Sequence, residues 1–358
     1  MKPLVSILIP AYNSERWIGD TLRSALGQSW ERKEIIVVDD GSRDGTLAVA
    51  EQFTKYGVQV VSQANQGAAA ARNQAYALCS GDYIQWLDAD DLLSPDKISL
   101  QMAAAMRSTS KSRLFSSSWG AFLNRYHTAK FVPSALWHDL SPKEWLLRKL
   151  GQNLFMQTAT WLVSRELTES VGQWDTRLLS DDDGEYFSRV LLASDGVEFV
   201  PGAKVYYRMV PNSLSYVGTS DRKRDAHLLS MQLHIGYLRS LEDTPRVRQA
   251  CVQYLQNCLI YFYPERSDIV EKMSKLATEL GGELKPPSLK WKYKCIKWVA
   301  GWRTARHAEM TLQRIRWSLQ RSLDEMMYRV ENRKPGEDTL GECETARHQI
   351  AARSDDGR

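Results

Sequence analysis

The sequence predicts an α/β fold: a mostly parallel sheet flanked by helices, followed by an α-helical carboxyl-terminal extension. Over roughly the first hundred residues, short apolar β-rich runs alternate with amphipathic stretches, a pattern typical of parallel sheets covered on both faces. From about Asp221 onward the pattern becomes helical. The length of 358 residues also fits one sizeable domain with an extension.

The expected elements follow from short apolar runs and from the turn and cap residues between them. Near the amino terminus, strands are expected at 5–9, 34–38, 58–61 and 83–87. Between these strands, helices are expected from Ser14, from about Thr46 to Tyr56 and from about Gly67 to Leu78. Ser94-Pro95-Asp96 has the signature of a further helix start, with a cap residue followed by proline. Later strands are expected at 114–123, 159–164 and 199–208.

These patterns divide the chain into three parts. Residues 1–220 form the expected catalytic domain, and residues 221–330 form a helical region with a basic, tryptophan-rich segment at 285–321. Residues 331–358 are polar and are expected to form a disordered tail.

Composition excludes several classes of protein. The five cysteines are an odd number without a Cys-x-x-Cys pair, which argues against a disulfide framework and against a zinc cage. The net charge of +4 is too small to indicate nucleic-acid binding by itself. No signal peptide is apparent, and no apolar run approaches the ~20 residues that cross a bilayer. A cytoplasmic protein is therefore expected.

Two acidic clusters follow predicted strands, at the edge of the sheet where ligands gather in such folds. Residues 39–42 (Asp-Asp-Gly-Ser) fit an ordinary turn, although Asp39 is also well placed to accept a hydrogen bond from a ring N–H of a base. Residues 88–91 (Asp-Ala-Asp-Asp) place three carboxylates beside an apolar strand, where a divalent cation is the natural neutralising partner. The alternative is that Asp91 helps to start the next helix and the other two are solvated.

Two further segments carry candidate chemistry. Residues 180–185 contain four acids before a predicted helix; they fit either helix capping or a general base that removes a proton from an attacking hydroxyl. Residues 65–73 form a helix with a glycine-containing start, whose amides suit an anion and whose Arg72 reaches a pyrophosphate or, alternatively, is a simple surface arginine. No phosphate-binding loop, dinucleotide motif or metal-spaced histidine pair occurs.

Together, the motifs at 5–13, 34–46, 65–73 and 82–91 resemble those of the inverting glycosyltransferases of family 2, whose nucleotide-sugar-binding domain has the GT-A (Rossmann-like) fold. The order of four motifs is specific, although each alone is weak. The resemblance covers about residues 4–216. It implies sugar transfer from a nucleotide-diphosphate donor, with a uridine diphosphate sugar expected, to a saccharide or lipid-linked acceptor in cell-surface polysaccharide or glycolipid synthesis.

The resemblance also implies roles for individual residues. The residues expected to bind the nucleotide are Pro10, Ala11, Tyr12, Asn13, Asp39, Arg72 and Asp88. Asp90 is expected to coordinate the metal, Mn²⁺ or Mg²⁺, which neutralises the charge of the departing diphosphate.

The catalytic base of the family lies in a later Glu-Asp motif, and Asp182-Asp183 takes its place here. Aspartate at the first position is a departure from the family pattern that leaves Asp183 as the candidate base. The residues expected on the acceptor or diphosphate side are Asp182, Glu185, Arg189 and Arg208. Tyr207-Arg208 with Ser213 and Ser215 resembles the closing segment of the family, without its usual histidine.

Segment 285–321 contains ten lysines and arginines and a single acid, Glu309, with tryptophans interleaved. Such a segment fits association with an anionic membrane surface, and it equally fits helices that pack their aromatic residues on the catalytic domain. Two rival functions are a non-catalytic scaffold built on a transferase domain and a sugar-nucleotide pyrophosphorylase. The second rival usually needs a glycine-rich basic loop after the first strand, and residues 11–15 do not form one.

Overall fold

The structure is a computed structural model that describes residues 2–210 and 220–331. In chain order, with 3-10 helices labelled η, its elements are β1 (Val5–Ala11), α1 (Ile18–Leu26), β2 (Lys33–Asp39), α2 (Thr46–Glu51), η1 (Thr54–Tyr56), β3 (Val58–Ser62), α3 (Ala68–Leu78), β4 (Tyr83–Trp86), β5 (Leu92–Leu93), α4 (Lys97–Arg107), β6 (Leu114–Phe122), η2 (Tyr126–Thr128), β7 (Lys130–Phe131), α5 (Pro142–Gln152), η3 (Thr158–Thr160), β8 (Val163–Ser164), α6 (Arg165–Val171), α7 (Asp182–Ala193), β9 (Val197–Arg208), α8 (Asp221–Leu241), α9 (Pro245–Cys258), η5 (Leu259–Tyr261), α10 (Ser267–Glu279), η6 (Trp291–Tyr293) and α11 (Lys294–Glu331). Ser213, Ser215 and the expected tail after residue 331 lie outside the described residues.

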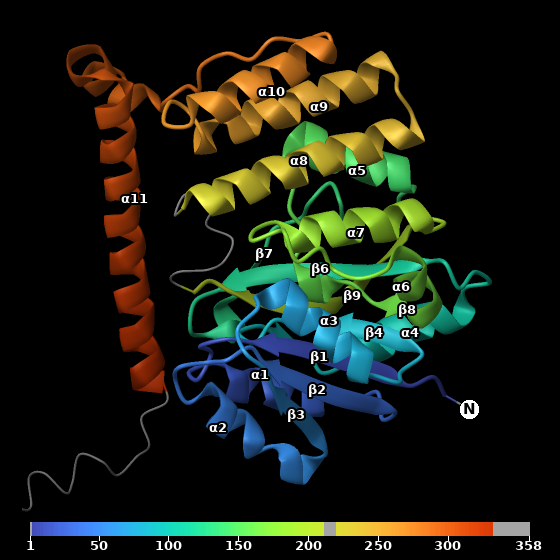
Figure 1. Cartoon of the computed structure of the whole chain (residues 1–358). Helices are drawn as coiled ribbons and strands as arrows, with labels where there is room; N and C mark the ends of the chain where they lie inside the picture. The colour runs from blue at the N-terminus through green and yellow to red at the C-terminus, as the bar shows by residue number, and fades with distance from the viewer. Residues whose placement is uncertain (1, 211–219, 332–358) are drawn as a thin grey trace, which may run out of the picture. The chain divides into compact units, whose positions relative to one another are not determined.

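The central sheet has the strand order β3-β2-β1-β4-β8. The first four strands are parallel, and only the short edge strand β8 runs antiparallel, against β4. The predicted mostly parallel α/β sheet is therefore confirmed. In its register, Ala11 at the end of β1 lies beside Asp39 at the end of β2. The loops after β1, β2 and β4 consequently open at one edge of the sheet (Figure 1).

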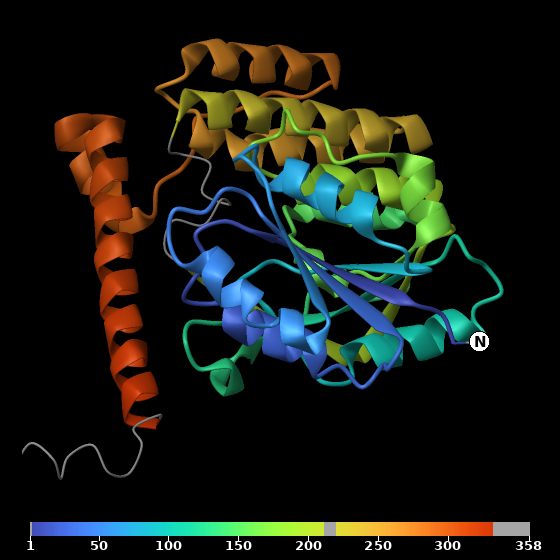
Figure 2. The same ribbon diagram turned by 60° about the horizontal axis from the view of Figure 1, so that its bottom comes forward.

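Both faces of this sheet are buried, because each central strand is apolar at successive positions. Val5, Ile7 and Ile9 of β1 pack with α1 and α4, whereas Leu8 faces the opposite side and packs with α3 and α7. Figures 1 and 2 show α1 and α2 on one side of the sheet and α3 on the other. Side chains that bind a ligand must therefore come from the loops at the strand ends.

A second sheet has the order β5-β9-β6-β7. The predicted strands at 114–123 and 199–208 are its long members β6 and β9, which pair in parallel with a bulge at Ser117 and Ser118. Strand β5 follows the acidic loop at 88–91 directly and pairs with β9. The second sheet thus anchors the end of that loop.

Four predicted elements differ in the structure. The helix expected from Ser14 begins only at Ile18, and the helix expected from about Thr46 to Tyr56 ends at Glu51 and is followed by the short 3-10 helix η1. The strand expected at 159–164 is wrong for its first half, because Thr160 donates its hydroxyl to the Gln157 carbonyl (2.6 Å) and closes a 3-10 turn. The helix expected from Ser94 begins only at Lys97. Ser94 is held in extended backbone, since its N–H donates to the Lys204 carbonyl (3.0 Å) beside β5.

Helices α8, α9 and α10 belong to the same compact unit as the sheets, which comprises Met1–Phe122 and Thr128–Trp291. Their apolar faces join α5 and α7 in one core; examples are Met231 of α8, Leu255 of α9 and Met273 of α10. The expected boundary at residue 220 therefore lies inside this unit.

A second unit comprises Leu123–His127 and the chain from Lys292, of which the structure describes residues up to Glu331. Its helix α11 is broken at Gly301, whose φ of 81° is incompatible with a continuous helix. Within this unit, Asp324 accepts hydrogen bonds from the Asn124 backbone N–H (2.9 Å) and from Arg125 Nε (3.0 Å). Across the described part of the chain, no helix combines the length and apolar character needed to cross a membrane.

Candidate active site

The loops after β1 and β2 lock together at the edge of the sheet. Asn13 has a φ of 49°, which asparagine tolerates better than most residues. Its N–H donates to Ser42 Oγ (2.9 Å) and its Oδ1 accepts from the Arg43 N–H (2.8 Å). Pro10 and Ala11 are buried within β1, whereas Tyr12 is 44% exposed. Of these predicted nucleotide-binding residues, Tyr12 and Asn13 therefore have side chains that solvent reaches.

Asp39 ends β2 and is buried. Its Oδ2 accepts hydrogen bonds from the Ser42 N–H (3.3 Å) and the Ser62 hydroxyl (3.2 Å), while its Oδ1 has no partner among the described residues. A buried carboxylate oxygen without a donor is costly unless a ligand supplies one. The ring N–H of a nucleotide base is such a donor.

The neighbouring Asp40 has a structural role that the sequence did not reveal. Its two carboxylate oxygens accept hydrogen bonds from Gln63 Nε2 (2.7 Å) and from the N–H groups of Gln66 (2.9 Å) and Gly67 (2.8 Å). Gly67 has a φ of 93°, which glycine adopts without strain. Asp40 thus fixes the start of α3, the helix that carries Arg72.

The three carboxylates after β4 have different surroundings. Asp91 is buried, accepts a hydrogen bond from the Arg208 N–H (2.7 Å) and another from Gln157 Nε2, and holds the loop in place. Asp88 and Asp90 are partly exposed. Burial, together with the charge of Asp88, raises the pKa of Asp90 to about 7, and Arg208 offsets part of this shift. No described side chain donates a hydrogen bond to the Asp90 carboxylate.

Arg72 joins the two main acidic clusters. It is buried, its Nη2 donates to Asp88 Oδ1 (2.8 Å) and its Nη1 donates to Asp182 Oδ2 (2.6 Å). Its guanidinium lies over the ring of Trp174, 4.4 Å from the ring centroid. Burial alone lowers the pKa of Arg72, but Asp182 and Asp88 more than reverse this effect, so the guanidinium stays charged.

The start of α7 presents Asp182 and Asp183 beside this bridge. Asp183 Oδ2 accepts a hydrogen bond from the Thr158 hydroxyl (3.1 Å). Burial and the charges of Asp182 and Asp181 raise the pKa of Asp183 to about 7, although Arg72 opposes the shift. A carboxyl group with a pKa near neutrality has the properties of a general base.

Two predicted residues, Glu185 and Arg189, have their acceptors and donors engaged within the protein. Glu185 accepts hydrogen bonds from Arg189 Nε (2.7 Å) and from the Tyr237 hydroxyl (2.6 Å). Arg189 also donates to the carbonyls of Val171 and Gln173. These contacts attach α7 to α8 and to the turn after α6, which is a structural role and differs from the predicted role on the acceptor or diphosphate side.

Arg208 at the end of β9 is also buried, between the rings of Trp17 (4.5 Å) and Phe122 (4.6 Å). Its Nε donates to the Asp90 carbonyl (2.8 Å). Arg208 therefore supports the loop that presents Asp90, and its expected role on the acceptor or diphosphate side stays a prediction.

A buried polar network below α7 was not predicted. Asp181 accepts a hydrogen bond from the Ser230 hydroxyl (2.7 Å) and lies 3.5 Å from Nδ1 of His234, which also contacts the Tyr254 hydroxyl (3.1 Å). Burial lowers the pKa of His234 to about 4 despite the nearby Asp181 charge, so this histidine is neutral at pH 7. The network ties the start of α7 to α8 and α9.

A divalent cation fits the residues present. Among residues 2–210 and 220–331, there is no group of three or more His, Cys, Asp or Glu side chains that could hold a metal ion without other ligands. Mg²⁺ typically takes one or two protein carboxylates and completes its ligands with water and substrate phosphates. Asp88 and Asp90 offer that minimal set, and the Asp90 carboxylate is not engaged by another described side chain.

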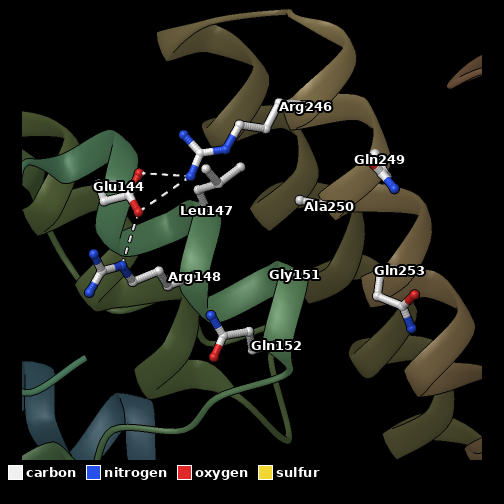
Figure 3. Close-up of a pocket in the computed structure, with 9 residues that line it drawn as sticks. All are labelled: Glu144, Leu147, Arg148, Gly151, Gln152, Arg246, Gln249, Ala250 and Gln253. Atoms are coloured by element: carbon white, nitrogen blue, oxygen red, sulfur yellow. Dashed lines mark hydrogen bonds and ion pairs between the residues drawn. The ribbon is translucent and has the colours of Figure 1, made fainter. Parts of the chain in front are cut away.

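One surface groove lies elsewhere, between α5 and α9, with a volume of about 390 Å³ (Figure 3). Glu144 forms ion pairs there with Arg148 and Arg246. None of the residues that line this groove belongs to the acidic clusters. The candidate site is therefore defined by its side chains and not by this groove.

Replacing Arg72 by methionine is expected to destabilise the fold by about 3–5 kcal/mol, because it leaves buried carboxylates without their cation. The loss should grow between pH 5 and pH 8. Burial raises the pKa of Asp182 and the charge of Arg72 lowers it, so this pKa should rise further in the variant. A carboxyl whose pKa is higher in the folded state than in the unfolded state destabilises the fold as pH rises. Urea denaturation at both pH values measures the effect.

Arg177→Met is the matched control, since Arg177 is 69% exposed and pairs with Asp175 at the surface. The free energy of unfolding of this variant is expected to fall by at most about 1 kcal/mol. Equal losses in the two variants, or a loss for Arg72→Met that shrinks with pH, would contradict the bridging role.

Residues 6–172 match the family model described as Glycosyl transferase family 2. This part of the chain therefore matches a family 2 glycosyltransferase domain, and the resemblance seen in the sequence is confirmed. Among curated proteins, it is 42% identical over 108 residues to the glycosyltransferase TuaG of Bacillus subtilis (strain 168), across 29% of this chain and 43% of the relative. It is 45% identical over 100 residues to a chondroitin synthase of Escherichia coli, across 27% of this chain and 15% of that protein. The match thus spans less than half of either relative.

Among solved structures, residues 1–349 of Staphylococcus aureus TarS in complex with UDP-GlcNAc superpose with a TM-score of 0.58 at 18% sequence identity. The superposition covers 77% of this chain and 80% of the TarS chain. At this identity the likeness shows the fold alone, and it confirms the predicted GT-A architecture.

Proposed function

We propose that this protein transfers a sugar from a uridine diphosphate donor to a hydroxyl of a saccharide or lipid-linked acceptor, with inversion at the anomeric carbon, in cell-surface polysaccharide or glycolipid synthesis. One observation carries the proposal. Arg72 brings Asp88 and Asp182 to one place, so the loop after β4 and the start of α7 meet at the edge of the sheet where Asp39 also ends β2.

The donor would lie along this edge of the sheet, with its base at the end of β2 and its diphosphate at the loop after β4. Asp39, with one carboxylate oxygen unpaired among the described residues, would accept the ring N–H of the base, and Tyr12 would cover it. Asp88 and Asp90 would hold Mn²⁺ or Mg²⁺, which when bound supplies Lewis-acid stabilisation of the leaving diphosphate. The TarS complexes with UDP and UDP-GlcNAc support a nucleotide-sugar donor on this fold.

Asp183 would act as the base. Its carboxylate takes the proton of the acceptor hydroxyl while the hydroxyl oxygen forms a bond to the anomeric carbon and the bond from that carbon to the diphosphate breaks. Thr158 orients the carboxylate through its hydroxyl. A pKa near neutrality leaves the group largely ionised at pH 8 and still basic enough to accept a proton.

The test is a thermal-shift series with uridine diphosphate sugars, with and without Mn²⁺. A ligand present at a hundred times its Kd stabilises the fold by about 2.7 kcal/mol, which is a readily measured shift. Stabilisation by one donor that needs the cation, together with slow donor hydrolysis, is expected. A scaffold would show no hydrolysis, and a pyrophosphorylase would release pyrophosphate from nucleoside triphosphate and sugar phosphate.

We also propose that segment 285–321 associates with an anionic membrane surface, where a lipid-linked acceptor resides. Trp291 is 81% exposed and Trp298 is 89% exposed, within a segment of ten lysines and arginines and one acid. Tryptophan side chains at a lipid interface and basic residues near anionic headgroups both favour such binding.

Co-sedimentation with vesicles of anionic lipid measures this binding. Each lysine near the membrane surface contributes about 1 kcal/mol to the free energy of binding, which is roughly a fivefold change in partitioning. Replacing Lys292 and Lys297 by glutamine should therefore weaken binding by roughly 25-fold. The control variant Tyr56→Ala removes a tyrosine that is 60% exposed on the sheet-containing unit and should bind as the wild type does. Wild-type protein that stays in the supernatant would remove this proposal.

A further inference from the structure

Three aromatic side chains from different elements meet near the candidate site. The ring of Phe155, in the segment between α5 and η3, lies 5.4 Å from Trp119 of β6 and 6.0 Å from Tyr207 of β9, measured between ring centroids. Trp119 and Tyr207 are themselves 5.8 Å apart and nearly perpendicular. Phe155 is 42% exposed, although it is a large apolar side chain in a folded unit.

The segment that carries Phe155 is fixed to both acidic clusters. Gln157 donates a hydrogen bond to Asp91 of the first cluster, and Thr158 donates one to Asp183 of the second. Tyr207 is equally constrained, because the N–H of the next residue, Arg208, donates to Asp91 (2.7 Å). The segment that carries the exposed ring is therefore held in place, since Phe155 lies three residues before the Thr158 contact with Asp183, and two other rings support it.

The strand order of the central sheet places the segment that follows Phe155 on the side of the site opposite the base-binding residues. Asp39 ends β2, the cation-binding loop follows β4, and β4 separates β1 from β8. Residues 157–159 lie beyond β4 on the β8 side, since Gln85 of β4 donates to the Ala159 carbonyl (2.9 Å). A donor that extends from Asp39 to Asp90 leaves the far side, with Asp183 and Phe155, for the other substrate.

We propose that Phe155, supported by Trp119 and Tyr207, is the platform on which the acceptor sugar ring stacks. This inference rests on the proposed function and adds to it the class of acceptor: a pyranose, whose C–H face is apolar and whose rim carries hydroxyls. An aromatic ring accepts the C–H face, while the nearby Asp183 accepts the proton of one hydroxyl at the rim. An acceptor whose reacting part is a lipid phosphate has no such face.

Saturation-transfer NMR tests the platform with methyl β-glycosides of glucose, galactose, N-acetylglucosamine and N-acetylgalactosamine. Each is measured with the whole chain, once with UDP and Mg²⁺ and once alone. We expect at least one glycoside to receive saturation, strongest at the protons of its C–H face. Phe155→Ala should weaken that binding by roughly 3- to 10-fold, whereas Phe155→Tyr should retain it. Tyr56→Ala, which removes an exposed tyrosine elsewhere, should behave as the wild type.

The UDP signal separates this proposal from the proposed function. UDP binding that persists in Phe155→Ala while the sugar signal falls supports the platform. Joint loss of both signals would mean that Phe155 supports the fold, and this result would overturn the platform. Wild-type sugar binding in Phe155→Ala, or the absence of glycoside binding to the wild-type protein, would overturn it as well. If UDP fails to bind the wild type, the proposed function fails, and the glycoside titration without UDP still decides the platform.

Discussion

Replacing Asp183 by asparagine is expected to lower kcat by about 10²–10⁴-fold, while the Kd for the donor changes by no more than about twofold. Asparagine has nearly the same shape and keeps an oxygen for the Thr158 hydroxyl, so the start of α7 should stay in place. It cannot take a proton from the acceptor. Initial rates with saturating donor, and calorimetry of donor binding, measure the two quantities separately.

The same residue predicts a pH dependence. Because the pKa of Asp183 is raised to about 7 and the base acts only when ionised, kcat/KM of the wild type should fall tenfold per unit as pH drops below about 7. Stability should move in the opposite direction. A carboxyl whose folded pKa exceeds its unfolded value contributes stability at low pH that is lost as pH rises through about 7. Rate profiles and thermal unfolding from pH 5 to pH 9 test both signs.

Asp268→Asn is the control for these measurements, since Asp268 lies at the surface, paired with Arg266. It should leave the rate and the profile unchanged. An Asp183→Asn variant that turns over at more than about a tenth of the wild-type rate would assign the base to another group.

Replacing Asp90 by alanine is expected to abolish cation-dependent transfer, with a loss of at least about 10²–10³-fold, because stabilisation of the leaving diphosphate by a cation amounts to several kcal/mol. The fold should not suffer. Burial and Asp88 hold the pKa of Asp90 at about 7, so its ionised form is a destabilising charge at pH 8 when no cation is bound. The cation-free variant should therefore unfold at a higher temperature than the cation-free wild type.

Asp96→Ala provides the comparison, as Asp96 is an exposed residue at the start of α4 with no side-chain capping bond. It should show wild-type activity and wild-type response to Mn²⁺. Retained activity in Asp90→Ala, or a variant less stable than the wild type at pH 8, would show that Asp90 is structural and would remove it from the cation site.

Much of the fold could be predicted because its signals are local. The central strands are continuous apolar runs that end at polar loops, and each run corresponds to a strand of the sheet. Two of the errors have different causes. Ser94 looks like a helix cap until its N–H pairs with the Lys204 carbonyl, more than a hundred residues later. Thr160 looks like a strand residue, but a local turn forms there, in which its hydroxyl bonds to the carbonyl of Gln157, three residues earlier.

The candidate site divides in the same way. Asp39, Asp88 and Asp90 follow strands and could be found from position alone. Asp40 and Asp91 stand in the same motifs, yet they are structural, and only their hydrogen bonds reveal it. Gln157 and Thr158 carry no motif, so no local pattern in the chain could connect them with carboxylates far away in sequence. Arg189 had the expected spacing, but its donors are engaged within the fold.

The shared core of α5, α7 and α8–α10 has a consequence for recombination between related proteins. The family match ends at residue 172, yet the apolar side of α7 is covered by helices that lie well beyond that point. A crossover between relatives at residue 172 or 220 would pair a helix layer with an unrelated surface. Recombination that preserves this core should therefore keep α7 together with α5, α8, α9 and α10, so that the candidate-site carboxylates and the helices behind them are exchanged as one block.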